Sequence, residues 1–455
     1  MPLRRDVISR IPYRRLRRVA AGLLHEAPRR KRELIEAVVN CRHSIARILE
    51  RLTVPELRHV ASKLSISRSS STKHELIARI CGDRKRMLRS RIVTSLRRQG
   101  FRVTDNRISP THDLDKDRIR ALHSDAVAHR REVAGRYLAK KEDSLIEWIA
   151  DGASVSVEKI DPALVEVQPD TVEELVFRYA ALHWQIPVSS GYGRRLRYLV
   201  VDQSNSKLIG IIGLGDPVFA LAPRDQWIGW NAADRKQRLC HVVDAYALGA
   251  VPPYSHLLAG KLVALLATSV EVLSRFNAKY SGKEAIISGM EREGDVALIT
   301  TTSALGRSSV YNRLKYQEDT VYHRVGFTKG SGDFQFLNGM YDEIAEFAAN
   351  TLSPTAKHDR WGTGFRNRRE VVRKTLSAVG LTQDFLYHGI EREIFVAPTA
   401  TNSREFLQGA ECELQYLDRN ASDLVCWYKT RWLFGRAERL QTFRTFQKDD
   451  YRLWP

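Results

Sequence analysis

Leu196-Arg-Tyr-Leu-Val-Val-Asp202 and Leu208-Ile-Gly-Ile-Ile-Gly-Leu-Gly215 are two short apolar runs, and Gln203-Ser-Asn-Ser-Lys207 joins them. Apolar runs of strand length on either side of a polar turn predict a β-hairpin. The sequence therefore places a β-sheet in the middle of the chain, and the neighbouring segments indicate how that sheet is completed.

Further strands and helices are predicted after this hairpin. Leu239–Gly249 predicts a strand that Pro252 and Pro253 end, and a long apolar helix follows from about Ser255 to Tyr280. The remaining predicted elements are a strand at Val296–Ser303, a short helix at Ser308–Tyr316, and a closing hairpin at Val321–Phe327 and Phe334–Leu337. The class is α+β with a mixed sheet. The order of elements resembles an acyltransferase-type fold of the GNAT class, in which a sheet is splayed beside a long helix.

The positive charge of the chain is concentrated at its N-terminus. Residues 1–100 contain 26 Lys and Arg against 8 Asp and Glu, which is +18 of the net charge of +20, while the other 355 residues contain 47 against 45. Such segregation indicates a region that faces a polyanion, and a phosphate backbone is the commonest partner. The basic residues expected to contact DNA are Arg14, Arg15, Arg17, Arg18, Lys73, Arg84, Lys85 and Arg86.

Two short helices in this region suggest a DNA-binding motif. Thr53 is the expected N-cap of the first helix, and Ser71 or Thr72 that of the second. Over about thirty residues the apolar spacing, together with Lys73, resembles a SAP motif, a helix–loop–helix that holds DNA by its backbone. An ordinary helical hairpin with a solvated charged face is the alternative.

Several stretches contain more Gly, Arg, Trp and small polar residues than packing requires. They are Gly191-Tyr-Gly-Arg-Arg195, Gly215-Asp-Pro-Val218, Arg224-Asp-Gln-Trp-Ile-Gly-Trp230, Asp244-Ala-Tyr-Ala-Leu-Gly-Ala-Val-Pro-Pro-Tyr-Ser-His256 and Thr300-Thr-Thr-Ser-Ala-Leu-Gly-Arg-Ser-Ser-Val-Tyr-Asn-Arg313. In this order they resemble the DruA family of the Druantia anti-phage defence systems, from about residue 90 to 340. The resemblance implies a role in defence against phage beside a large helicase-like partner, and it names no reaction.

The polar residues near the predicted strand ends are candidates for catalysis and anion binding. The layout also resembles the phage DNA-modifying acyltransferase Mom, in which Ser255 and Tyr311 have counterparts. Asp244 and His256 are candidate acid/base groups and Tyr311 a proton donor. The expected phosphate or anion ligands are Arg194, Arg195, Ser303, Ser308 and Ser309, with Gly306 in the same turn. Each single residue also has a structural explanation, such as helix capping by His256.

The donor of a transferase remains open. Coenzyme A is usually bound by backbone N–H groups of a Gly-rich turn after the fourth strand, and here Pro252 and Pro253 remove two donors. No cofactor is therefore assigned. A metal-dependent nuclease or transposase that uses Asp202, Asp216 and Asp244 is an alternative. A DNA sensor without chemistry that recruits a helicase partner is another.

Composition limits the compartment and the domain organisation. The N-terminus lacks an apolar signal core and no stretch reaches the roughly 18 apolar residues of a membrane span, so we expect a cytoplasmic protein that binds DNA and other defence proteins but no membrane. The five cysteines have no metal-clip spacing, and Asp113, Asp115 and Asp117 cap a helix rather than bind calcium. The expected divisions are a basic arm and helix (1–45), the SAP-like segment (46–84), a helical connector (85–185), the GNAT-like core (186–340) and a mixed α/β C-terminal segment (341–455).

Overall fold

The chain forms two compact units in the computed structural model, which describes residues 2–24, 26–41, 43–64, 66, 72–104, 106–188, 193–283, 295–355, 361, 362 and 364–454. Unit 1 consists of Met1–Leu114, Ala121–His129 and Gly330–Gly389, and unit 2 of Asp115–Arg120, Arg130–Lys329 and Ile390–Pro455. The boundaries expected at residues 85, 186 and 341 do not coincide with these units, because residues distant in sequence pack together in each of them.

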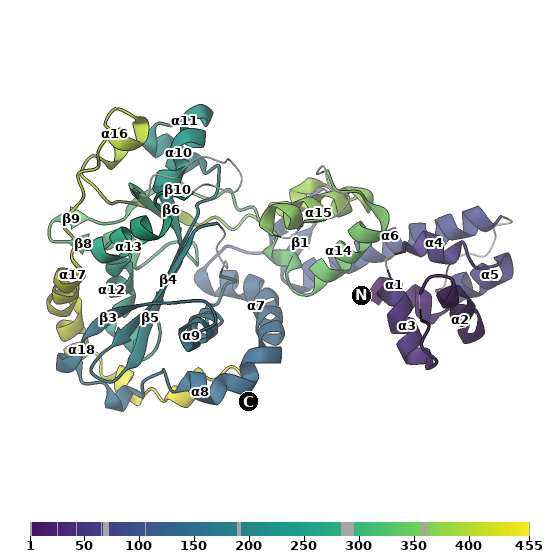
Figure 1. The fold of residues 1–455 in the computed structure, drawn as a ribbon, viewed down its shortest axis with the longest axis horizontal. Coiled ribbons are helices and arrows are strands. Elements are labelled where there is room, and N and C mark those ends of the chain that lie inside the picture. The colour runs from purple at the N-terminus through teal and green to yellow at the C-terminus, as the bar shows by residue number, and fades with distance from the viewer. Residues whose placement is uncertain are drawn as a thin grey trace. The chain divides into compact units, whose positions relative to one another are not determined.

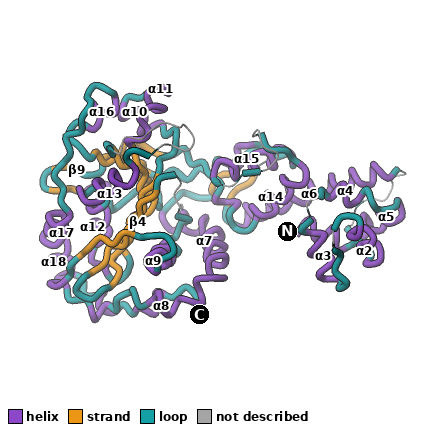
Figure 2. The backbone as a smooth tube through the Cα atoms, viewed as in Figure 1, coloured by secondary structure: helices purple, strands orange, loops and turns teal. Residues whose placement is uncertain are grey.

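Unit 2 is built on a seven-stranded mixed sheet (Figures 1 and 2). Its spatial order is β10-β11-β7-β6-β5-β4-β3. The strands are β3 (Pro162–Glu166), β4 (Arg195–Asp202), β5 (Lys207–Gly215), β6 (Val242–Ala250), β7 (Leu298–Thr302), β10 (His323–Phe327) and β11 (Glu393–Pro398). All neighbours are antiparallel except β6 and β7, which are parallel. The mixed α+β class and the hairpin of β4 and β5 are thus confirmed.

Helices cover both faces of this sheet. On β4, Tyr198 and Val200 belong to the core under α12 (Ala259–Leu266) and α13 (Val270–Tyr280), while Leu199 and Val201 face α9 (Val172–Ala181). Successive side chains of a strand point to opposite faces, so a continuous apolar run is what a doubly covered strand requires. The second face is extended by α10 (Ala222–Ile228) and α16 (Ser403–Gln408), which pack on Val242.

The prediction of one continuous helix over residues 255–280 is wrong. A 3-10 turn at Tyr254–Leu257 precedes α12, and α13 begins anew at residue 270. The Ser269 hydroxyl accepts a hydrogen bond from the Val272 N–H at 3.4 Å, which is the N-cap that separates α13 from α12. An apolar pattern can continue through such a break because both helices bury the same side.

Two other predicted elements also differ. The helix expected at 308–316 is a 3-10 turn, Tyr311–Arg313, followed by the short strand β8 (Lys315–Tyr316), which pairs with β9 (Asp319–Thr320). The closing hairpin does not form, because Phe334–Phe336 is a 3-10 turn of unit 1 and β10 pairs instead with β11, about seventy residues later. Long-range pairing of this kind leaves no local signal in sequence.

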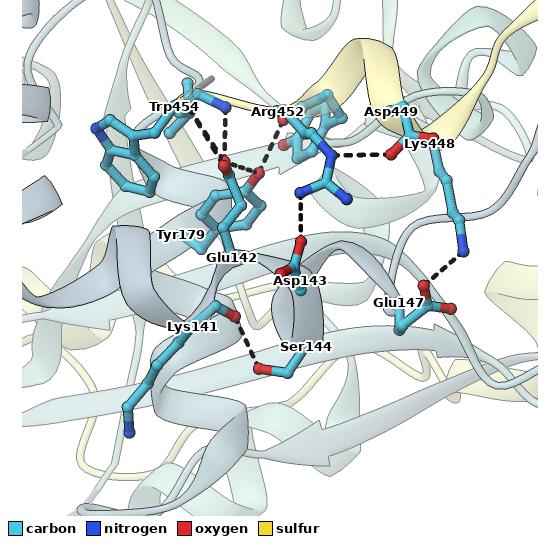
Figure 3. A network of polar contacts seen from close by, with 12 residues as sticks. Lys141, Glu142, Asp143, Ser144, Glu147, Tyr179, Lys448, Asp449, Arg452 and Trp454 are labelled. Carbon is cyan, nitrogen blue, oxygen red and sulfur yellow. Dashed lines mark hydrogen bonds and ion pairs between the residues drawn. The ribbon is translucent and has the colours of Figure 1, made fainter.

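The C-terminal residues pack on unit 2 through a buried carboxylate (Figure 3). They follow α17 (Ala421–Tyr428), a π-helical turn at Lys429–Leu433 and α18 (Phe434–Arg439). Glu142, in α8 (Glu142–Ile146), is 3 % exposed and accepts hydrogen bonds from the Tyr179 hydroxyl (2.8 Å) and the backbone N–H groups of Leu453 (2.6 Å) and Trp454 (3.3 Å). The end of the chain is thereby held against α8 and α9.

Unit 1 is mostly helical. Its helices are α1 (Pro2–Ser9), α2 (Tyr13–Ala21), α3 (Lys31–Val39), α4 (Ile45–Leu49), α5 (Val54–Lys63), α6 (Lys73–Arg98), α14 (Met340–Thr351) and α15 (Phe365–Ala378), and its only described strands are β1 (Phe101–Val103) and β2 (Ile108–Pro110). The all-α expectation for the first 84 residues agrees with the described part. Thr53 and Glu56 form the capping box of α5, and Thr72 caps α6, whereas Ser71 lies outside the described residues.

The helix α7 (Lys116–Leu138) begins at the N-cap that the sequence predicts. The Asp115 carboxylate accepts a hydrogen bond from the Arg118 N–H at 2.8 Å and so caps α7, as expected. α7 supplies residues to both units.

Within the described ranges, we find no helix with the length and apolar character that crossing a bilayer demands.

Candidate functional site

The parallel strands β6 and β7 separate soon after they begin. They pair at only three positions, Val242 with Leu298, Val243 with Ile299, and Asp244 with Thr300. Beyond Asp244, β6 continues along β5 to Ala250, while β7 stays paired with β11. The β6–β7 ladder therefore ends at Asp244 and Thr300, and the Thr301 hydroxyl donates to the Ala245 carbonyl at 2.9 Å just beyond them.

Asp244 lies half-buried at that point. Its Oδ1 accepts a hydrogen bond from the Thr300 hydroxyl at 2.9 Å. Burial raises the pKa of the Asp244 carboxyl to about 6, while the Thr300 hydrogen bond and the positive charge of Arg224 act to lower it. A carboxyl with a pKa near 6 exists in both forms close to neutral pH, which is the property a general acid or base needs.

Tyr311 belongs to the 3-10 turn Tyr311–Arg313, which follows β7 in the chain. It is 8 % exposed and packs against the rings of Tyr322 and Phe395, with ring centroids 5.0 and 5.3 Å away. Burial raises the pKa of Tyr311 to about 12, the negative charge of Asp244 adds to this rise, and a hydrogen bond with Thr301 opposes it. The structure therefore brings together two of the predicted catalytic residues, Asp244 and Tyr311, within electrostatic range.

Ser255 and His256 lie beyond the other end of β6. Ala250, the last residue of that strand, is about 20 Å from Asp244 if each residue adds about 3.3 Å. The His256 carbonyl accepts a hydrogen bond from Arg436 Nε at 3.1 Å, and its ring stands edge-on to Phe446. Burial lowers the pKa of His256, and the charge of Arg436 lowers it further. The structure thus does not place Ser255 and His256 beside Asp244.

The turn predicted to bind an anion holds a carboxylate of the chain itself. Glu393, which is 1 % exposed, accepts hydrogen bonds from the Ser308 N–H (2.8 Å) and the Asn312 side chain (2.9 Å). Its own N–H is bonded to the Ser303 hydroxyl (3.0 Å) and the Gly306 carbonyl (3.1 Å), and Ser309 lies exposed in the same turn. The anion bound at this turn is thus a side chain of the protein itself.

The two arginines expected to clamp phosphate differ in environment. Arg194 is 3 % exposed, and its Nε donates to Asp216 Oδ1 at 2.6 Å while Nη2 donates to the Val242 carbonyl at 3.2 Å. Arg195 is exposed, with its backbone N–H bonded to the Tyr280 hydroxyl. Arg194 therefore holds the ends of β5 and β6 together, and only Arg195 faces solvent.

A buried ion cluster beside Asp244 was not predicted. Arg224 is completely buried and bonds the Asp225 carboxylate through Nε (2.8 Å) and Nη2 (2.6 Å), as well as the carbonyls of Val218 and Phe219. Arg235 binds the other oxygen of Asp225 at 2.9 Å. The sequence offered one signal for this cluster, the adjacent Arg224 and Asp225 in the Arg224–Trp230 motif. Opposite charges next to apolar residues suggest an internal ion pair.

The three carboxylates of the nuclease alternative do not converge. Asp202 lies at the turn between β4 and β5, where it accepts hydrogen bonds from the Asp161 N–H and the Tyr254 hydroxyl. Asp216 follows the opposite end of β5 and pairs with Arg194. Over the part of the chain that the structure describes, no three His, Cys, Asp or Glu side chains are grouped as metal ligands. These three acids therefore offer no shared metal site.

The basic residues of unit 1 separate into exposed and internal ones. Arg14, Arg17 and Arg18 are exposed on α2, whereas Arg15 pairs with Glu56. Lys73, Lys85 and Arg86 are exposed on α6, and the Lys73 ammonium bonds the Glu50 carbonyl. Arg84 is only 2 % exposed and lies near Glu346, so it faces the interior of the unit rather than solvent.

Comparison with known proteins gives the family of this sequence. The family model described as "Druantia protein DruA" matches residues 113–409. The chain belongs to the DruA family. It is also 37 % identical over 372 residues to the Druantia protein DruA of Escherichia coli (strain UMEA 4076-1), an alignment that covers 82 % of this chain and 90 % of that relative. No solved structure matches.

The match to the family model covers a shorter stretch of the chain than the 372-residue alignment with the relative. It begins at residue 113, shortly before α7, and ends at Gly409, the C-cap of α16. The matched range includes the paired strands β6 and β7, Asp244, Tyr311 and the Arg224 cluster. Most of the basic N-terminal helices lie before it.

Proposed function

We propose that this chain is a DNA-binding component of a prokaryotic anti-phage defence system, and that unit 2 is a GNAT-like transferase that acts on nucleic acid. Membership of the DruA family implies the defence role. The observation that carries the transferase proposal is the position of Asp244 and Tyr311 at the point where β6 and β7 separate. Other Druantia proteins, including a helicase, are the proposed partners.

The sheet supports a GNAT-like assignment for unit 2. Four strands, β3 to β6, form an antiparallel series, α12 and α13 follow on one face, and β7 then returns parallel to β6. The pair β11 and β10 completes the sheet beyond β7. The predicted GNAT layout had the same sequence of an antiparallel series, a helix and a strand beside the splayed sheet, although its last hairpin was placed elsewhere.

The turn after β6 does not fit the pyrophosphate of coenzyme A. Pro252 and Pro253 lack N–H groups, and the Val251, Ser255 and His256 N–H groups are bonded to the carbonyls of Ile209, Val251 and Pro253 at 2.9, 2.8 and 3.0 Å. Donors used internally are not available to cradle a phosphate. The proposed group donor is therefore of another chemical class, and no step is assigned to coenzyme A.

The two site residues suit complementary proton transfers. Ionised Asp244 would accept the proton of the attacking nucleotide group, and Tyr311, whose pKa is near 12, would be protonated at neutral pH and donate to the leaving group. Thr300 holds the Asp244 carboxylate by its hydrogen bond. Because Asp244 must be ionised to act as the base, the rate of transfer should rise with pH through about 6.

DNA binding is proposed for unit 1. Its first hundred residues carry +18, and Arg14, Arg17, Arg18, Lys85 and Arg86 are exposed. The helices α5 and α6, with the Thr53 capping box, support the SAP-like interpretation of residues 46–84. Contacts of this type read the phosphate backbone, so affinity should depend on salt more than on base sequence.

The test combines nucleoside mass spectrometry with phage protection. DNA incubated with the protein and cell extract should give nucleosides of increased mass, and the Asp244→Asn and Tyr311→Phe variants should lose both this change and protection while keeping DNA affinity. Tyr322→Phe removes the hydroxyl of a neighbouring ring that bonds only the Ala264 carbonyl (2.9 Å), and it should retain both activities.

The alternatives predict different results. Magnesium- or manganese-dependent cutting of DNA would favour the nuclease. Full protection by both site variants, with no change in nucleoside mass in any sample, would refute the reaction centre and favour a DNA sensor.

A further inference from the structure

A cleft of about 300 Å³ lies along α6 in unit 1, on the face opposite to the one that α6 buries. Arg86, Arg89 and Arg97 line it, together with the hydroxyl groups of Ser90 and Thr104. Apolar side chains from α6, from β1 and from the segment after α15, including Leu381, complete the wall. No acidic residue is found among its described lining residues, so the polar part of the lining consists of guanidinium and hydroxyl groups.

The helical repeat explains why these arginines share one surface. Positions 86, 89, 90 and 97 recur at spacings of three, four and seven, which lie on one side of an α-helix. The buried face carries Leu88, Ile92 and Leu96, each fully enclosed. Apolar residues thus fix the rotation of α6, and the three guanidinium groups are turned toward the cleft as a consequence.

Arg89 is held in place by a neighbouring helix terminus. Its Nη1 donates to the Gly380 carbonyl, and the Val379 carbonyl lies 3.5 Å away, just after the end of α15. A cation at the C-terminal end of a helix is favoured by the helix dipole. A guanidinium has five N–H donors, more than these two carbonyls use, so an oriented Arg89 can bind an anion in the cleft without first losing rotamer freedom.

The dimensions and composition of the cleft define the ligand. Arg86 and Arg97 are eleven residues apart on the helix, about 16 Å at 1.5 Å per residue. That length is enough to contact several successive phosphates of one strand. Arginine and hydroxyl groups are donors for phosphate oxygens, and the described lining has no aromatic ring for base stacking.

We propose that this cleft binds one strand of a polynucleotide through its phosphate backbone, independently of base sequence. The inference rests on the proposed DNA binding of unit 1 and specifies the strand-binding surface within it. It assigns Arg89, Arg97, Ser90 and Thr104, which sequence reasoning did not single out, and places Arg86 with them. The concave form distinguishes this surface from the exposed arginines of α2.

The test uses the full chain and a paired control on the same unit. Arg86→Gln with Arg97→Gln removes two cleft charges, and Arg373→Gln with Arg102→Gln removes two exposed charges outside it. Arg102 alternates with Val103 on β1, so it points away from the face that lines the cleft. Binding of a fluorescein-labelled oligo-dT and of a duplex of the same length is measured by anisotropy over a salt series.

The cleft variant should bind oligo-dT at least about fivefold more weakly than the control variant, and its salt slope should be smaller by about 1.4, which is two lost contacts at about 0.7 each. Its duplex affinity should match that of the control. Equal oligo-dT affinity in the two variants, or a loss confined to the duplex, would overturn the inference. Failure of the unaltered chain to bind either DNA would instead refute the proposed DNA binding.

Discussion

Arginine has opposite roles in the two units. In unit 1, Arg14, Arg17 and Arg18 extend from α2 into solvent. In unit 2, Arg194 and Arg224 are enclosed and paired with Asp216 and Asp225. A buried charge is tolerated only when its partner and hydrogen bonds replace water, whereas an exposed charge keeps its hydration and attracts distant anions. The same residue type therefore stabilises one unit and is offered to a polyanion by the other.

The largest expected effect is the loss of stability when the buried Arg224 of unit 2 is replaced. Arg224→Ala should lower the free energy of unfolding of unit 2 by about 3–5 kcal/mol, because it leaves the Asp225 carboxylate buried without its main partner. Urea denaturation followed by tryptophan fluorescence measures this change, since Trp230 lies beside Arg224. Arg17→Ala on the exposed side should change stability by less than about 0.5 kcal/mol. Similar losses for both variants would contradict the distinction.

A second internal charge, Glu142, extends the comparison to a carboxylate. Glu142→Ala should cost about 2–3 kcal/mol of unfolding free energy, since it removes the acceptor of the Tyr179 hydroxyl and of two backbone N–H groups. The neighbouring Asp143, 92 % exposed at its side chain, pairs with Arg452 at 2.8 Å, and Asp143→Ala should cost less than about 1 kcal/mol. Carboxypeptidase digestion should shorten only the Glu142 variant faster than the unaltered chain.

The role of the exposed arginines on α2 is tested by measuring DNA affinity. Replacing Arg14, Arg17 and Arg18 by Ala should weaken duplex binding roughly tenfold, about 1.4 kcal/mol, and reduce the salt slope by about 2–3, because three phosphate contacts are lost. The charge-matched control replaces Arg178, Arg431 and Arg439, which are exposed in unit 2. If both triple variants lose affinity equally, net charge alone governs binding and α2 has no particular part in it.

The smallest effect concerns an internal acid of unit 1. Burial raises the pKa of Glu346, with Arg84 and Arg4 opposing the rise and Glu343 near by. The protonated form is thus favoured on folding, so this group's contribution to stability is present below its ordinary pKa and is lost as pH rises through the raised value. Glu346→Gln should gain stability relative to the unaltered chain between pH 4 and 7, on the order of 1 kcal/mol. Parallel stability curves over that range would refute this.

How far the site could be predicted differs between its residues. Asp244 and Tyr311 were proposed because polar residues beside apolar strand ends are conspicuous in sequence, and in the structure the charge of Asp244 acts on Tyr311. His256 and Ser255 satisfied the same criterion, yet they lie past the far end of β6. Proximity in sequence to a strand does not determine which end of that strand a side chain occupies.

The anion-binding turn illustrates a different limit. Serines and a glycine near a turn predict N–H groups that can bind a negative charge, and the Ser308 N–H donates to the Glu393 carboxylate. The sequence does not reveal that Glu393, eighty-five residues after Ser308, provides that charge. Only the pairing of β11 with β7 brings Glu393 to the turn, because antiparallel register places Ile394 opposite Thr302.

The sequence by itself determined the local elements and the distribution of charge: the β4–β5 hairpin, the capped helices α5 and α7, and the excess of basic residues in the first hundred. These features depend on turn residues, caps and composition, which act over a few positions. The tertiary structure alone decided the place of β11, the break between α12 and α13, and which arginines are buried. Those outcomes depend on which distant surfaces exclude water together, and that is a property of the folded chain as a whole.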